Sequence, residues 1–209
     1  MVVFYLHGFA SSARSSKALF FAGRFEARGV EVHIPDFNEP DFSTLTVTRM
    51  IEQVEARMVG KNDVVLIGSS LGAFVAVQLA LRRPQQVSRL VLLAPALDCS
   101  RERMRDFGDL DEWQRRDRLD VFHYAYGRIV PLHFELVRDA GRYDCLEAQL
   151  PMPVLVFQGR RDTAVNPESV ERWARNRPGV ELHMLDDDHQ LHASLEYIWR
   201  EMVRFVALP

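Results

Sequence analysis

Hydrophobic residues along this chain alternate between short apolar runs and longer segments with helical spacing. The short runs, rich in β-branched, aromatic and leucine residues, predict buried strands at 2–6, 30–34, 64–67, 90–93, 153–158 and 180–185. The longer segments carry apolar residues every three or four positions, and they predict helices that begin near 15–16, 43–44, 73, 166 and 193. Such alternation implies a mainly parallel sheet of about six strands with helices on both faces.

One long segment interrupts this alternation. Between about 97 and 150 no apolar strand run occurs, and the segment contains helical patches, many charged residues and several aromatic residues. A connection of this length is uncommon unless it has its own structure and role. We therefore expect 97–150 to form a mostly helical cap that is inserted into a core made of 1–96 and 151–209.

A glycine-serine motif follows the third predicted strand. The motif is Gly68-Ser69-Ser70-Leu71-Gly72, and a helix-forming run begins directly after it. A strand, Gly-x-Ser-x-Gly and a helix in this order form a nucleophile elbow. Ser70 is expected at the tip of a sharp turn in a strained conformation, so its neighbours must be small. The alternative is a turn without chemistry, which a base, an acid and an oxyanion hole elsewhere in the chain would argue against.

A base and an acid follow the last two predicted strands. Asp162 comes after the fifth strand and His189 after the sixth, so both are expected at the same sheet edge as Ser70. A serine hydroxyl needs an imidazole to take its proton, and the imidazole needs a carboxylate to orient it. The order Ser70, Asp162, His189 is that of triads on nucleophile-elbow folds. Asp98 and the run Asp186-Asp187-Asp188 are alternative sources of the acid.

The loop after the first strand supplies the remaining part of such a site. An oxyanion hole takes one backbone N–H from the residue after the nucleophile, here Leu71, and one from this loop. The loop begins His7-Gly8-Phe9, and we expect the second N–H from Phe9. The alternative is a turn that only ends the strand.

The other candidate residues carry weaker signals. His33, His183 and His192 are expected to be structural, whereas His123 and His133 lie in the cap and could touch a substrate. No set of His, Cys or carboxylate residues has metal-site spacing, so we expect neither a metal nor a cofactor. Five cap aromatics are candidate substrate-binding residues, with attachment of the cap to the core as the alternative: Trp113, Phe122, Tyr124, Tyr126 and Phe134.

Composition narrows the class of protein and its surroundings. The 209 residues suffice for one good-sized core, and the hydrophobic fraction of 47% is ordinary for a globular protein. A net charge of -3 argues against general affinity for nucleic acid or an anionic membrane. Only Cys99 and Cys145 are present, and no export signal or membrane-spanning run is visible, so we expect reduced thiols and a cytoplasmic location. The oligomeric state is open, with a homodimer as one option.

These motifs together resemble those of a known superfamily. The chain is similar to compact α/β-hydrolases, and in particular to small bacterial esterases that begin with a Tyr-Leu-His-Gly-Phe strand. The matching residues are Tyr5-Leu6-His7-Gly8-Phe9, Ser11-Ser12, Ser15 or Ser16, Lys17, the motif at 68–72, Gly159-x-x-Asp162 and His189. The resemblance implies carboxylester hydrolysis and, with strands numbered along the chain, the spatial order 2-1-3-4-5-6. The segment 97–150 is longer and more charged than in the smallest members.

The expected function is therefore that of a serine hydrolase. Ser70, His189 and Asp162 would cleave a small acyl ester or thioester through an acyl-enzyme, with the amides of Phe9 and Leu71 as the oxyanion hole. An acyltransferase or a cofactor-free perhydrolase would use the same residues with another acceptor. A non-catalytic ligand-binding homologue is the alternative from a different class, and it predicts an incomplete triad.

Overall fold

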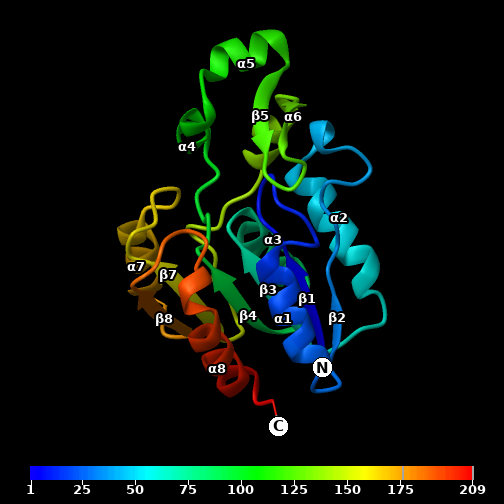
Figure 1. Cartoon of the computed structure of the whole chain (residues 1–209), viewed down its shortest axis with the longest axis vertical. Helices are drawn as coiled ribbons and strands as arrows, with labels where there is room; N and C mark the ends of the chain where they lie inside the picture. The colour runs from blue at the N-terminus through cyan, green and yellow to red at the C-terminus, as the bar shows by residue number, and fades with distance from the viewer. Residues whose placement is uncertain (176, 209) are drawn as a thin grey trace.

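The computed structural model describes residues 1–175 and 177–208, which contain a six-stranded parallel sheet (Figure 1). The strands are β1 (Val2–Leu6), β2 (Glu31–His33), β3 (Val64–Ser69), β4 (Val87–Leu93), β7 (Val154–Gly159) and β8 (Val180–Leu185). Their spatial order is β2-β1-β3-β4-β7-β8. The six apolar runs of the sequence thus became the six strands, in the order that the resemblance implied.

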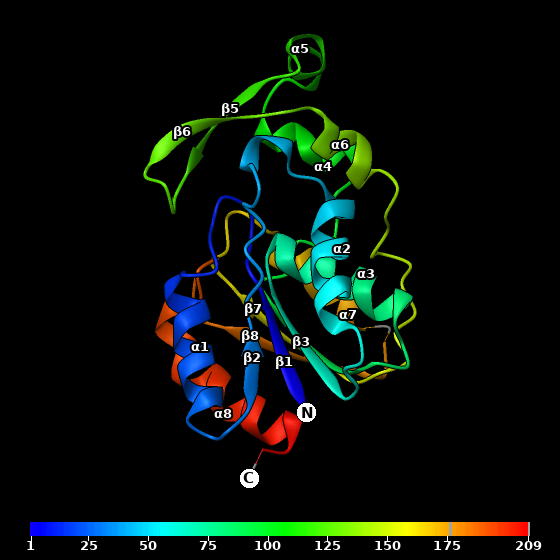
Figure 2. The ribbon, with the colours of Figure 1, turned by 90° about the vertical axis from the view of Figure 1, so that its right-hand side faces the viewer.

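Helices cover both faces of this sheet. On one face α1 (Ser16–Glu26) and α8 (Leu195–Val206) lie side by side, and the other face carries α2 (Val47–Met58), α3 (Leu71–Arg82) and α7 (Pro167–Arg175) (Figure 2). Alternate residues of β1 serve the two faces: Val3 and Tyr5 pack in the core under α1 and α8, whereas Phe4 and Leu6 pack on the opposite side. Burial on both faces explains why β1 is apolar throughout and why β3 and β7 are apolar over their first four residues.

The helix that follows the nucleophile motif is the most deeply buried one. In α3 every residue from Leu71 to Ala80 is buried. The helix α1, in contrast, packs only one stripe and begins with a capped turn, because the Ser15 side chain accepts a hydrogen bond from the N–H of Ala18. Since α1 follows a parallel strand, its first residues lie at the carboxyl edge of the sheet, where the candidate residues also gather.

The segment 97–150 lies over that carboxyl edge and contains more than helices. It consists of α4 (Arg101–Met104), a 3₁₀ turn η2 (Arg105–Phe107), α5 (Leu110–Arg116), the antiparallel hairpin β5 (Leu119–His123) and β6 (Arg128–Leu132), and α6 (Glu135–Ala140). Figure 2 shows the hairpin reaching out above the sheet. The sequence did not predict the hairpin, because its strands mix charged and apolar residues and β6 contains Pro131.

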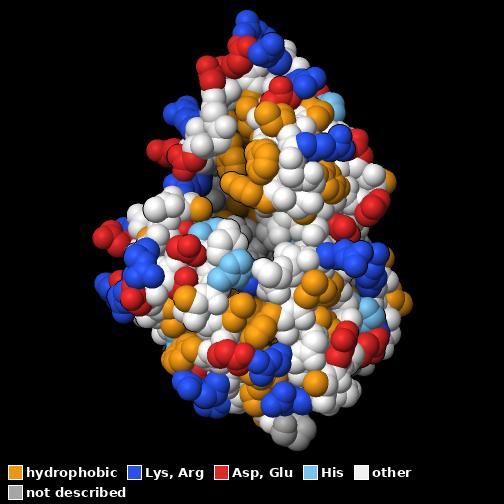
Figure 3. Space-filling model, in the orientation of Figure 1, with side chains coloured by type: hydrophobic (Ala, Val, Ile, Leu, Met, Phe, Trp, Pro, Cys, Tyr) orange, Lys and Arg blue, Asp and Glu red, His pale blue; other side chains and the backbone are white. Residues whose placement is uncertain are grey.

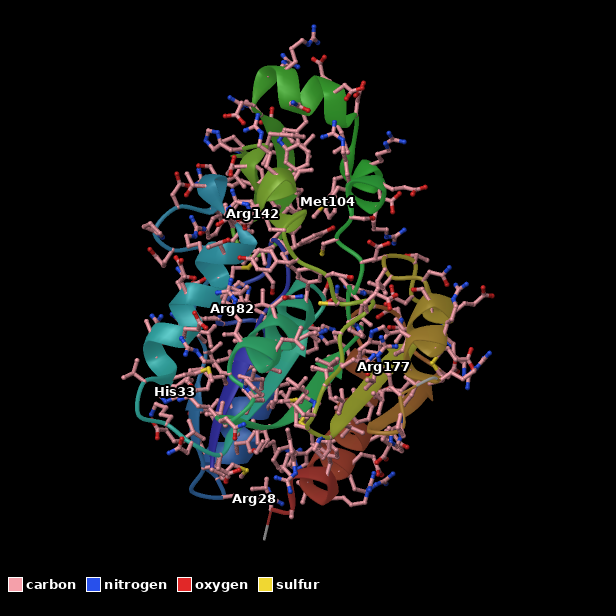
Figure 4. The ribbon with its side chains drawn as sticks, turned by 180° about the vertical axis from the view of Figure 1, so that it is seen from behind. Arg28, His33, Arg82, Met104, Arg142 and Arg177 are labelled. Atoms are coloured by element: carbon pink, nitrogen blue, oxygen red, sulfur yellow. The ribbon has the colours of Figure 1, made fainter. Side chains whose placement is uncertain are left out.

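Specific contacts join this segment to the core. The buried Trp113 indole donates a hydrogen bond to the carbonyl oxygen of Leu132 at 2.9 Å, which fixes α5 on the hairpin. The hydroxyl and N–H of Thr48 on α2 donate to the Asp139 carboxylate at 2.6 and 2.7 Å. Arg177, labelled in Figure 4, donates to carbonyl oxygens at the end of the segment, those of residues 146 and 148. The segment is therefore held against both α2 and the chain after α7.

Two further expectations concern the chain as a whole. Across the helices that the structure describes, none has both the length and the hydropathy needed to cross a membrane. Cys99 and Cys145 are both buried as free thiols. Burial raises the pKa of the Cys99 thiol to about 12, so this side chain packs as a small neutral group.

Candidate active site

The turn between β3 and α3 holds Ser70 in a strained conformation. Ser70 has φ 54° and ψ −118°, a region that side-chain-bearing residues rarely adopt. A Cβ atom at Gly68 would lie 2.4 Å from the Cα of Ala73, and one at Gly72 would lie 2.0 Å from the Leu6 carbonyl oxygen. Both approaches are too close for any side chain. The two glycines therefore allow the sharp turn that presents the Ser70 hydroxyl at the wall of a cavity.

Two other loops bring His189 and Asp162 to this hydroxyl. The Nε2 atom of His189 lies 3.1 Å from Ser70 Oγ, and its Nδ1 atom lies 2.8 Å from Asp162 Oδ2. The three residues are separated by up to 119 positions in sequence, and the loops after β3, β7 and β8 join them into one hydrogen-bonded chain. This is the arrangement in which an imidazole can take the serine proton.

The surroundings of Asp162 keep its carboxyl group ionised. Burial alone would raise its pKa, but hydrogen bonds from His189, the Val165 N–H and Gln158 outweigh that effect and hold the pKa below its ordinary value. The carboxylate can then only accept, so the proton of the imidazole belongs on Nδ1. The lone pair of His189 Nε2 is consequently left facing the Ser70 hydroxyl.

A glycine also sets the distance between the two loops that carry Asp162 and His189. A Cβ atom at Gly159 would lie 2.5 Å from the carbonyl oxygen of Asp188. The alternative acids have other partners: the Asp188 carboxylate accepts the N–H of residue 190 at 2.8 Å, and the Asp98 carboxylate accepts the N–H of residue 100 at 2.9 Å. Asp186 forms an ion pair with Arg161.

Two backbone N–H groups beside Ser70 are available to a ligand. Within the described chain, no residue accepts a hydrogen bond from the N–H of Phe9 or Leu71. The imidazole of His7 holds the first of these loops, because its Nδ1 donates to the Gly8 carbonyl oxygen at 2.9 Å and its Nε2 accepts the N–H of Phe37 at 3.0 Å. These are the donors that an oxyanion hole requires.

A cavity of about 1250 Å³ is lined by Ser70 and His189, with Asp162 buried behind them. Figure 3 shows it as a hollow between the segment 97–150, whose wall carries hydrophobic side chains, and the core, whose wall shows histidine. Of the five aromatic residues proposed from the sequence, Phe122 and Tyr124 line this cavity. Both are more than half exposed, as expected of side chains on an open wall.

The other three aromatics do not line this cavity and pack within the inserted segment, in line with the packing role that the sequence left open. Trp113 and Phe134 are buried inside the inserted segment, where their ring centroids lie 5.6 Å apart. Tyr126 stacks on His123 with a centroid separation of 3.8 Å. The hairpin covers Trp113, whose indole donates to the Leu132 carbonyl oxygen of β6, and the sequence without the hairpin could not show this packing.

The histidines of the cap also have structural partners. His123 is buried and its Nε2 lies 3.0 Å from Asn38 Oδ1, whereas His133 lies 3.1 Å from an Asp117 oxygen. His192, which the sequence analysis left as structural, lines the cavity instead, and its Nε2 lies 3.0 Å from Ser16 Oγ. Position in the sequence does not distinguish it from the other loop histidines.

One cluster of metal-ligand residue types occurs in the described part of the chain. Glu181, His183 and Glu201 place their oxygen and nitrogen atoms close together, and Arg204 pairs with both carboxylates. An arginine in this position supplies the positive charge that the carboxylates need. The cluster belongs to β8 and α8 rather than to the cavity wall, so we assign it a structural role.

Comparison with known proteins places the chain in a family. A family model with the description "Uncharacterised protein family (UPF0227)" matches residues 2–207. The chain belongs to this family. Among curated proteins, this UPF0227 chain is 35% identical over 99 residues to the biotin biosynthesis bifunctional protein BioHC of Teredinibacter turnerae. That match covers 44% of the chain and only 17% of the BioHC protein.

Solved structures agree with the observed fold. Est1E of Butyrivibrio proteoclasticus with bound ferulic acid superposes with a TM-score of 0.81 at 20% identity, covering 99% of this chain and 89% of that one. Mouse alpha/beta hydrolase domain-containing protein 10 gives a TM-score of 0.79 at 16% identity, with 98% and 89% covered. The UPF0227 chain therefore has the α/β-hydrolase fold that its motifs predicted.

Proposed function

We propose that this protein is a serine hydrolase that cleaves small carboxylic esters or thioesters through an acyl-enzyme intermediate. The observation that carries the proposal is the hydrogen-bonded chain from Ser70 through His189 to Asp162, with distances of 3.1 and 2.8 Å. The fold is compatible with many functions, so the argument rests on this geometry rather than on the fold.

Acylation follows from the protonation states derived above. His189 Nε2 takes the Ser70 proton as the hydroxyl oxygen attacks the ester carbonyl carbon, and the Asp162 carboxylate stabilises the imidazolium that forms. The negative charge that develops on the carbonyl oxygen accepts hydrogen bonds from the N–H groups of Phe9 and Leu71. His189 then gives its proton to the leaving alcohol or thiol, which departs and leaves an acyl group on Ser70.

Deacylation repeats these steps with water as the nucleophile. His189 takes a proton from water as its oxygen attacks the acyl carbon, and then returns the proton to Ser70 as the carboxylic acid is released. The cavity is open enough for water to reach this point. With an acyl acceptor other than water, the same residues would catalyse acyl transfer. Identification of the product, a free acid or a new ester, therefore shows which acceptor is used.

A labelling experiment tests this function directly. A fluorophosphonate probe should modify the wild-type protein at Ser70, and mass spectrometry of the digested protein identifies the labelled residue. Turnover should then be measured on p-nitrophenyl esters and acyl thioesters of graded length. The panel includes methyl ferulate, because Est1E, a protein of the same fold, binds ferulic acid.

The variant Ser70→Ala gives the quantitative prediction. Loss of a triad serine costs on the order of 10⁶ in kcat where this has been measured for another serine hydrolase. We therefore expect Ser70→Ala to lose both labelling and turnover while its thermal unfolding stays cooperative. A variant that keeps more than a few percent of the activity on an ester cleaved by the wild type would refute the proposal.

A further inference from the structure

The start of α1 forms a polar part of the cavity wall that the proposed mechanism does not use. Ser15, Ser16 and Lys17 line the cavity there, and His192 approaches Ser16 from the opposite loop. This wall belongs to the same cavity as Ser70 and His189. A substrate bound at Ser70 therefore has access to it.

Lys17 has no partner in this wall. Its side chain is only 7% exposed, yet no ion pair or hydrogen bond joins its ammonium group to any residue that the structure describes. The backbone N–H groups of Ser16 and Lys17 also lack acceptors among the described residues, as is usual in the first turn of a helix. The positive end of the α1 dipole and Lys17 thus border the same cavity.

The charge of Lys17 is maintained although it is not paired. Burial lowers its pKa to about 8, while the carboxylates of Asp162, Asp188 and Asp187 act in the opposite direction. At pH 7 the ammonium form therefore predominates. None of these carboxylates forms an ion pair or hydrogen bond with Lys17 among the described residues. Asp162 binds His189, and one Asp187 oxygen accepts the N–H of Asp188 at 2.8 Å while the other is buried without a hydrogen-bond partner.

On the basis of the proposed hydrolysis at Ser70, we propose that Lys17 and the start of α1 form a subsite for an anionic group, a carboxylate or phosphate, of the substrate. A substrate displaces water when it fills the cavity. A neutral ester would then leave a buried ammonium group without a partner, whereas an acid-bearing ester would supply one. Sites that are built around a polar contact reject analogues that lack it.

The composition of the chain sets Lys17 apart. Of the 26 basic residues only Lys17 and Lys61 are lysines, and the others are arginines. Lys61 lies at the other edge of the sheet, where its ammonium group pairs with Glu31 at 3.0 Å. A lysine presents a compact charge with three donors, whereas the planar guanidinium of arginine needs more room. Lys61 therefore provides a matched control for Lys17.

The first experiment compares acid-bearing esters with neutral esters of similar shape. One pair, monomethyl adipate and dimethyl adipate, places the acid in the acyl part, and a second pair, O-butyrylglycolate and propyl butyrate, places it in the alcohol part. Released acid is measured at constant pH for the wild type, Lys17→Met and Lys61→Met. We expect at least a tenfold preference in kcat/KM for the acid-bearing member of one pair, which identifies the part that the subsite holds.

Lys17→Met should lower that preference ratio by about ten- to a hundredfold, whereas Lys61→Met should keep the wild-type ratio. A wild type without preference in either pair, or a Lys17→Met variant that keeps the preference, would overturn the subsite. Absence of fluorophosphonate labelling and of turnover on all four esters would instead overturn the hydrolase itself. The two failures are thus distinguishable.

A binding measurement covers the case in which Lys17→Met does not fold. Labelling lysine with ¹³C at the ε carbon gives two NMR signals, and Lys61→Met assigns them. Monomethyl adipate or O-butyrylglycolate is added to Ser70→Ala, which is expected to bind without turnover. The preferred ligand should shift the Lys17 signal and move its titration to higher pH, because an anion favours the ammonium form. An unchanged Lys17 signal at saturating concentrations of both ligands would overturn the proposal.

Discussion

At the scale of single residues, the environment of each side chain decides what it can do. The Asp162 carboxylate accepts four hydrogen bonds, from His189, Gln158 and the N–H groups of residues 164 and 165. These bonds fix both its charge and its direction. The orientation of His189, and with it the basicity available to Ser70, therefore depends on one buried carboxylate.

The variant Asp162→Asn tests this dependence. Its amide can occupy the same space, but it removes the negative charge that orients and stabilises the imidazolium, so kcat should fall on the order of 10⁴. Steady-state kinetics on a p-nitrophenyl ester measure the change. A fall of less than about tenfold, together with a larger loss in Asp98→Asn or Asp188→Asn, would assign the acid to one of those residues.

The charge of Lys17 gives a prediction of pH dependence. Because its pKa lies near 8, the ammonium form predominates below pH 8 and is lost as the pH rises through that value. The preference in kcat/KM for an acid-bearing ester over its neutral partner should thus fall about tenfold between pH 7 and pH 9, since kcat/KM reports the free enzyme.

Other titratable groups act near Lys17 and must be separated from it. Asp162, Asp187 and Asp188 lie within Coulombic range, and His189 and Tyr5 share the cavity wall. Titrations that affect both esters alike cancel in the ratio of their kcat/KM values. A ratio that stays constant from pH 6 to pH 9 would contradict the assignment.

At the scale of elements, the site depends on how closely strands and helices approach. The turn from β3 to α3 brings Gly72 against the end of β1, and Gly159 brings the β7 loop against the β8 loop. Both contacts are backbone to backbone, so neither neighbour can move aside in the way that a flexible side chain can. Close main-chain packing, together with backbone hydrogen bonds such as that from the N–H of Arg161 to the carbonyl oxygen of Asp187 at 3.0 Å, thus holds these loops together.

Gly72→Ala should therefore disrupt the turn. Its Cβ atom would lie 2.0 Å from the Leu6 carbonyl oxygen, and we expect a loss of about 3 kcal/mol or more in the free energy of unfolding together with loss of fluorophosphonate labelling. Gly23→Ala is the matched control, because Gly23 lies within α1 with open space around it. That variant should gain roughly 0.5–1 kcal/mol. Chemical denaturation measures both values, and equal effects would contradict the account.

At the scale of the whole molecule, the cavity is formed by two parts of the chain. The core supplies the hydrogen-bonded residues, and the segment 97–150 supplies the opposite, more apolar wall (Figure 3). Contacts such as that between Phe9 and Phe107, with ring centroids 5.3 Å apart, join the two walls beside the predicted oxyanion hole. The inserted segment is thus in a position to select the substrate.

Phe122→Ala tests this role of the segment. Removal of a lining aromatic ring should change the preference among acetyl, butyryl and octanoyl esters by about ten- to a hundredfold in kcat/KM, since each pocket methylene contributes about 1 to 3 kcal/mol of discrimination. Tyr126→Ala, on the same hairpin but stacked on His123, should leave the ranking unchanged. The same ranking in both variants would mean that the segment does not set chain-length specificity.

The sequence by itself determined the order of strands and helices in the core, though not in the segment 97–150, and the three residues of the predicted triad. A parallel strand that is buried on both faces must be apolar on both faces, so it appears in the sequence as a short run of apolar residues. The turn at 68–72 needs glycines at fixed positions, and the β7 and β8 loops carry Asp162 and His189 directly after a strand. Each of these signals lies within a few consecutive residues, which is why it can be recognised in the sequence without knowledge of the fold.

Only the tertiary structure decided which side chains line the cavity. The hairpin of β5 and β6 turned Phe122 toward the cavity and left Trp113 in the interior, although both are aromatic residues in one charged segment. Lys17 lies in an ordinary helical pattern, yet it is buried within Coulombic range of Asp162, Asp187 and Asp188, which come from loops distant in sequence. Solvent exposure and charge pairing depend on segments distant in sequence, so no local pattern encodes them.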